Sequence, residues 1–225
     1  PDLLPAGVKA MDHATGCFGR GRDAIPDQHG EFFIAALTGA LALYEKHVPA
    51  EQWQRWRERM KIRRADVIAG GTNNWETYVM KGEWMRTLAG LVSRADAIAA
   101  IENAWRSRQR ARIAGYPWRV YHDRTSDPDT LSVEAVGRGN LLALTHLGYD
   151  GPSAKEIAEA AEDGTRFTLM LQDPSGQMPT NGRTDDHVWA DVGYQLAFEV
   201  MAERTRKDSW LAGQFRHAAM LSFQN

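Results

Sequence analysis

One helix face that follows a long polar segment carries side chains suited to acid–base chemistry. His187, Asp191 and Tyr194 are spaced i, i+4 and i+7, so they share a face of a predicted helix. Asp191 would orient the imidazole of His187, which then serves as a general base or acid, and Tyr194 would lie one turn deeper. A capped helix start with a partly buried tyrosine is the alternative interpretation. Two more residues of this region are predicted to bind substrate, namely Arg183 and Trp189.

A second candidate site lies at the predicted start of another helix. Asn74 and Tyr78 are i and i+4 neighbours, which directs an amide and a phenol to the same side. Amides at a helix N-terminus, aided by the positive end of the helix dipole, suit a substrate carboxylate. Asn73 and Trp75 are assigned to substrate binding beside them. The alternative is that an asparagine only caps this helix while Trp75 packs in the core.

A third segment mixes aromatic and basic side chains. Trp118, Arg119 and His122 suit stacking on sugar rings and pairing with acidic groups. The same residue types also suit a protein interface. A weaker cluster lies in the opening segment, where solvated surface polarity is the expected role, and comprises His13, Arg20, Arg22, Asp27 and His29.

Helical apolar spacing runs through the chain, and the period-two spacing of strands is nearly absent. The predicted helices span residues 31–48, 51–68, 74–92, 93–114, 133–147, 153–171 and 186–204, and an eighth begins at 209. A polar segment, 12–30, precedes the first of them, and Ser153 to Glu156 has the form of a capping box. Short connections alternate with long ones, which predicts four antiparallel helix hairpins. The long polar connections then meet at one rim.

The predicted fold class is all-α, with helical hairpins forming an (α/α)n toroid or part of one. An open solenoid is the other arrangement considered, but it usually has a repeat of fixed length, and no such recurrence is found. We expect residues 1–225 to form a single toroid domain. Because the chain begins at Pro1 and ends without a stop signal, we expect it to be a fragment of a longer chain.

The composition excludes several classes of function. The net charge of -2 gives no bulk attraction to nucleic acid or to an anionic membrane, and the longest apolar stretches are about half of a membrane span. The single cysteine, Cys17, forms no internal disulfide, and no zinc spacing, phosphate loop or nucleophile elbow is found. We therefore expect no metal and no cofactor. No signal peptide is visible, which leaves a cytoplasmic or periplasmic location of bacterial type.

The Asn73-Asn74-Trp75 motif with Tyr78, together with the Arg183, His187 and Tyr194 region, resembles the α/α-toroid polysaccharide lyases of the heparinase II/III and alginate lyase type. An Asn-Asn-His motif is usual in that group, and Trp75 stands where the histidine would be. The resemblance implies β-elimination on a uronic-acid glycan, so the expected partner is an acidic oligosaccharide or polysaccharide. It also implies roles for the four catalytic candidates. Asn74, with Arg183, would neutralise the carboxylate, His187 or Tyr78 would remove the proton at C5, and Tyr194 would protonate the leaving oxygen.

Two other functions also agree with the sequence. A glycoside hydrolase on the same ring needs two carboxylic acids across the scissile bond, for which Asp123, Asp185, Asp186 and Asp191 are available. A non-catalytic helical scaffold would instead bind a protein partner through Trp118 and Arg119.

Overall fold

The computed structural model describes residues 3–71, 73–113, 115, 118–123, 131–178 and 188–224. Within these residues the regular structure is helical, and the one β-type pairing is an isolated bridge between Ile113 and Tyr121. The α-helices are α1 (Leu4–Gly19), α2 (Glu31–Tyr44), α3 (Ala50–Met60), α4 (Asn74–Leu88), α5 (Arg94–Ala104), α6 (Leu131–His146), α7 (Ala154–Leu169), α8 (Val188–Arg204) and α9 (Ser209–Gln224). The prediction of an all-α chain is confirmed.

The chain divides into two compact units, Pro1–Ile101 and Glu102–Asn225, and the boundary falls within α5. Each unit is described by itself. The expectation of one toroid domain over residues 1–225 stays a prediction.

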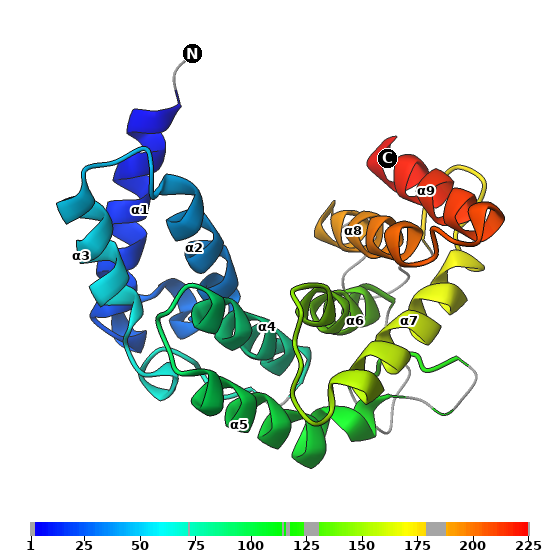
Figure 1. Cartoon of the computed structure of the whole chain (residues 1–225), viewed down its shortest axis with the longest axis horizontal. Coiled ribbons are helices and arrows are strands. Elements are labelled where there is room, and N and C mark those ends of the chain that lie inside the picture. Colours follow the sequence, from blue (N-terminus) through cyan, green and yellow to red (C-terminus); the bar gives the residue numbers. More distant parts are fainter. Residues whose placement is uncertain are drawn as a thin grey trace. The chain divides into compact units, whose positions relative to one another are not determined.

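In the first unit, α2 packs along α4 and α1 packs along α3 (Figure 1). Close approach of α2 and α4 depends on Gly82, because a Cβ there would lie 2.5 Å from a methyl carbon of Ile34. A fully buried guanidinium, that of Arg86, ties α4 to the end of α3. It pairs with Glu83 at 2.7 Å and donates to the carbonyl oxygens of Met60 and Ile62 at 3.0 and 2.6 Å.

In the second unit, α6 packs against α7 and α8, and α8 packs along α9 (Figure 1). The carboxylate of Glu102 joins α5 to the start of α7. It accepts hydrogen bonds from the Tyr149 hydroxyl at 2.7 Å and from the backbone N–H and hydroxyl of Ser153 at 2.8 and 2.7 Å. Burial opposes ionisation of Glu102, but these hydrogen bonds outweigh it and lower its pKa.

Three local predictions are wrong. The expected polar segment 12–30 contains the second half of α1, which buries Thr15, Cys17 and Phe18. The helix predicted over 51–68 ends at Met60, where Arg86 donates to the carbonyl oxygens of Met60 and Ile62. Ser153 is the N-cap residue of α7 but makes no side-chain cap, since its hydroxyl donates to Glu102 instead.

Candidate functional site

The start of α4 holds four of the predicted site residues together. Asn73 is the N-cap residue, and its Oδ1 accepts a hydrogen bond from the Trp75 N–H at 3.2 Å, which confirms the predicted cap. Asn74 is buried at 8% exposure, whereas Trp75 and Tyr78 are half-buried. The amides, the indole and the phenol therefore come from the first turns of one helix.

The first turn of α2 and the residues before it bring an aromatic cluster against that helix. We define this aromatic cluster as His29, Phe32, Trp75 and Tyr78. The imidazole of His29 lies edge-on to Trp75 with 4.5 Å between ring centroids, and Phe32 lies edge-on to Trp75 at 5.5 Å and to Tyr78 at 5.2 Å. Half-buried aromatic faces of this kind are suited to stacking on apolar faces of sugar rings.

A buried carboxylate holds the histidine of the cluster. The Nδ1 atom of His29 lies 2.9 Å from Oε1 of Glu31, and Oε2 of Glu31 accepts from the N–H of Ala69 at 3.1 Å. The side chain of Glu31 is 1% exposed and that of His29 is 25% exposed. Because an ionised carboxylate only accepts hydrogen bonds, Nδ1 carries the proton and Nε2 is the basic nitrogen. This is the arrangement of an oriented general base.

Backbone packing fixes the position of this pair. The N–H of Gly30 donates to the Val67 carbonyl at 3.0 Å, so the residue between His29 and Glu31 is held against the segment that follows α3. A Cβ on Gly30 would lie 2.3 Å from that same carbonyl oxygen. Glycine at this position therefore permits the close approach that orients His29.

A cation lies near the Tyr78 ring of the cluster. The ammonium of Lys81, one turn along α4, is 5.3 Å from the centre of the Tyr78 ring. Burial lowers the pKa of Lys81 to about 8, and burial raises the pKa of the Tyr78 phenol. At neutral pH the site therefore has a protonated phenol and a cation beside the oriented imidazole.

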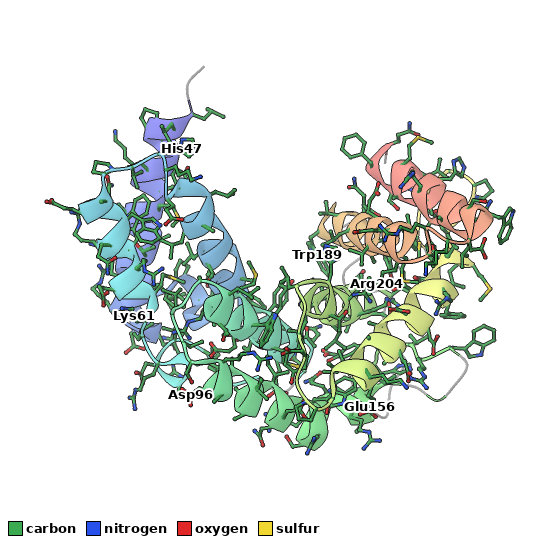
Figure 2. The ribbon with its side chains drawn as sticks, in the orientation of Figure 1. His47, Lys61, Asp96, Glu156, Trp189 and Arg204 are labelled. Atoms are coloured by element: carbon green, nitrogen blue, oxygen red, sulfur yellow. The ribbon has the colours of Figure 1, made fainter. Side chains whose placement is uncertain are left out.

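The remaining candidates lie in the second unit. Tyr194 is 1% exposed, and its hydroxyl donates to the Leu131 carbonyl at 2.7 Å and lies 3.4 Å from Oε2 of Glu134. Burial raises its pKa. Trp189, labelled in Figure 2, is 41% exposed on the first turn of α8. Two of the predicted residues, Arg183 and His187, lie outside the described residues.

The three predicted residues of the third segment, Trp118, Arg119 and His122, lie in the second unit. The Trp118 ring packs 4.9 Å from the ring of Phe167 and is still 48% exposed. Arg119 adopts a left-handed backbone conformation, with φ of 43°, and its Nε lies 3.4 Å from Asp163. The backbone N–H of His122 donates to the carbonyl oxygen of Arg112 at 2.8 Å. That this segment and the α8 residues share a rim with Asn74 and Tyr78 stays a prediction.

Sequence reasoning misses four residues of the α2–α4 site. It assigns His29 to surface polarity and does not single out Glu31, Phe32 or Lys81. A histidine two residues before a glutamate at a predicted helix start is a signal that was available for His29 and Glu31. Lys81 was also available from spacing, because it follows Tyr78 at i+3.

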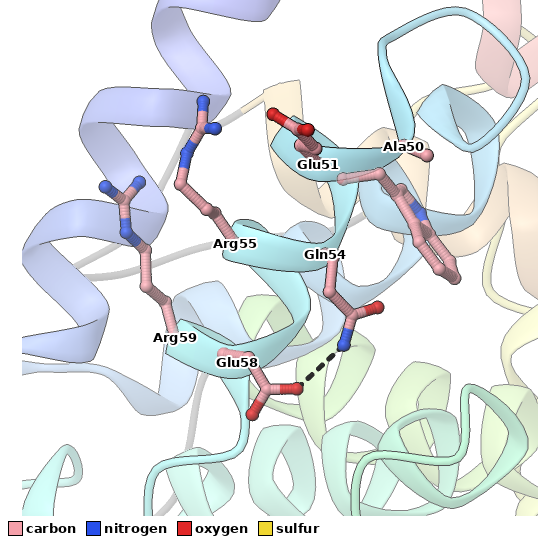
Figure 3. A pocket seen from close by; sticks show the side chains of 7 residues that line it. Ala50, Glu51, Gln54, Arg55, Glu58 and Arg59 are labelled. Atoms are coloured by element: carbon pink, nitrogen blue, oxygen red, sulfur yellow. Dashed lines mark hydrogen bonds between the residues drawn. The ribbon is translucent and has the colours of Figure 1, made fainter.

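Figure 3 shows a hollow along the outer side of α3, where charged side chains come from a single helix. The carboxylate of Glu58 accepts from the Gln54 amide at 2.8 Å and pairs with Lys61 at 2.8 Å. Arg59 pairs with Asp12 of α1 at 3.0 Å. The hollow is therefore lined by a single helix, and two of its charged side chains, Glu58 and Arg59, are already paired with neighbouring residues.

No group of three or more His, Cys, Asp or Glu side chains among the described residues is placed to hold a metal ion. In the part of the chain that the structure describes, no helix has both the length and the apolar character of a membrane span. In comparisons with protein-family models, curated proteins and solved structures, nothing matches this chain.

Proposed function

We propose that this protein is a polysaccharide lyase that cleaves a uronic-acid glycan by β-elimination at the α2–α4 site. The observation that carries the proposal is the His29 imidazole, held by the buried Glu31 carboxylate and packed 4.5 Å from Trp75. The lyases that the chain resembles usually have a histidine at the position of Trp75. In this protein an imidazole from before α2 lies against that tryptophan, which supports a base of the same kind supplied from elsewhere in the chain.

The chemistry requires three tasks that these residues are suited to perform. Nε2 of His29 takes the proton from C5 of the uronate, and the electron pair of that C–H bond becomes the C4–C5 double bond. The C4–O bond breaks, and the Tyr78 phenol, protonated at neutral pH, donates its proton to the leaving oxygen. The amides of Asn73 and Asn74 stabilise the charge that develops on the substrate carboxylate.

The proposal includes the toroid arrangement. Packing of alternate helices, α2 with α4 in one unit and α6 with α8 in the other, supports layered helices of that kind. The proposal assigns no step to Tyr194, because its hydroxyl is covered and bonded to the Leu131 carbonyl.

The test is turnover of a panel of uronate glycans, followed by ultraviolet absorbance of the unsaturated product. His29→Gln and Tyr78→Phe should each lower the rate about a hundredfold or more. His47→Gln is the matched control, because His47 is an exposed histidine near the C-terminal end of α2 (Figure 2). Full activity of His29→Gln would reject the site. Saturated products that have gained water would reject the lyase and support the hydrolase.

A further inference from the structure

Lys81 is a half-buried cation that has no acidic partner among the described residues. It lies on α4, and the described contact of its ammonium is with the Tyr78 ring at 5.3 Å. Arg86, one turn further along the same helix, is different. Its guanidinium is fully buried, but it is matched by Glu83 and by the carbonyl of Met60.

This contrast separates a structural cation from one that is available to a ligand. Removing a charge from water is costly unless an opposite charge or hydrogen bonds compensate for it, and an aromatic face compensates only in part. Because Lys81 is desolvated and still mostly protonated at neutral pH, an anion placed beside it recovers electrostatic energy. A planar carboxylate on a sugar ring bound along Tyr78 is an anion of suitable size.

We propose that Lys81 binds a carboxylate of the glycan and is the residue that makes the α2–α4 site select acidic over neutral sugars. This inference rests on the proposed function, since it takes the bound molecule to be a glycan. It assigns Lys81 a role in specificity and leaves proton transfer to His29 and Tyr78.

The test is a comparison of dissociation constants measured by calorimetry in the His29→Gln background, where turnover is slow. The probes are tetrasaccharides of polymannuronate, polygalacturonate and hyaluronan, each paired with its carboxyl-reduced neutral counterpart. The His29→Gln protein should bind at least one acidic probe about tenfold more tightly than its neutral pair. Adding Lys81→Met should bring the two constants to within about twofold, and Lys81→Arg should retain part of the preference.

Lys61→Met is the matched control, since Lys61 is an exposed lysine of the same unit (Figure 2) and should leave the preference unchanged. Circular dichroism of each variant verifies that it is folded. An unchanged preference in Lys81→Met, or no binding of any acidic probe, would overturn the inference. A preference that depends on Lys81 in a protein that forms no unsaturated product would reject the proposed function alone. A working lyase whose preference ignores Lys81 would reject this inference alone.

Discussion

Replacing Glu31 by glutamine tests the oriented histidine without changing the size of the side chain. The carboxylate accepts two hydrogen bonds in a buried position, one from His29 at 2.9 Å and one from the Ala69 N–H at 3.1 Å. A carboxamide has one acceptor oxygen, so either the Ala69 N–H loses its partner or the imidazole must give up the tautomer with the proton on Nδ1. A hydrogen bond to a charged group contributes about 1.5 to 3 kcal/mol, and we therefore expect Glu31→Gln to destabilise the first unit by about 2 kcal/mol.

The same substitution should reduce turnover. If the NH2 group of the glutamine faces His29, Nδ1 becomes the acceptor and the proton moves to Nε2, which can then no longer act as the base. We expect kcat/KM to fall about a hundredfold. Amide hydrogen exchange of α2, α4 and Ala69 measures the stability, and ultraviolet absorbance of the product measures the turnover.

Glu58→Gln is the control, since Glu58 is an exposed carboxylate that also accepts two hydrogen bonds, and no measurable change is expected there. If Glu31→Gln exchanges its Ala69 amide at the wild-type rate and keeps full turnover, the carboxylate does not orient the histidine and the reasoning is refuted.

Three further predictions concern packing and charge in the first unit. Gly30→Ala should destabilise the first unit by about 1 to 3 kcal/mol, because the new Cβ would lie 2.3 Å from the carbonyl oxygen of Val67. Gly39→Ala within α2 should be neutral or stabilising. Urea denaturation compares the two variants, and equal effects would show that Gly30 is not closely packed. Arg86→Met should lower the free energy of unfolding by about 3 to 5 kcal/mol in the same assay, since it leaves the buried carboxylate of Glu83 unpaired. A decrease below about 1 kcal/mol would show that the ion pair is not desolvated. Burial lowers the pKa of Lys81 from 10.5 to about 8 in the folded chain, so the unfolded chain binds more protons between these pH values. The free energy of unfolding should therefore rise with pH across that window, and it should rise less in Lys81→Met. An identical pH dependence in the two proteins would contradict the burial of this lysine.

The helices were the predictable part of the fold. Apolar spacing located the helices from α2 to α9, because burial of one helix face imposes a period that sequence retains. Their ends were less predictable. Helix α3 ends at Met60, where the Arg86 guanidinium of α4 donates to the carbonyl oxygens of Met60 and Ile62. That contact joins residues more than twenty positions apart.

The sequence could predict only those site residues that lie near one another along a single helix. Asn73, Asn74, Trp75 and Tyr78 are brought together by the turns of one helix, so their spacing alone placed them near one another. His29 joins them through packing of α2 on α4, and a pairing of helices across forty residues leaves no local pattern. The same reason accounts for Lys81, whose role depends on what lies around it.

The central claim is that His29 removes the C5 proton of a uronate, and proton NMR of the reaction product tests it most directly. With wild-type protein we expect loss of the C5–H signal and appearance of a vinyl H4 signal, at a rate that falls about a hundredfold in His29→Gln and is unchanged in His47→Gln. Cleaved products that retain the C5 proton, or a vinyl signal that forms at the wild-type rate in His29→Gln, would contradict it.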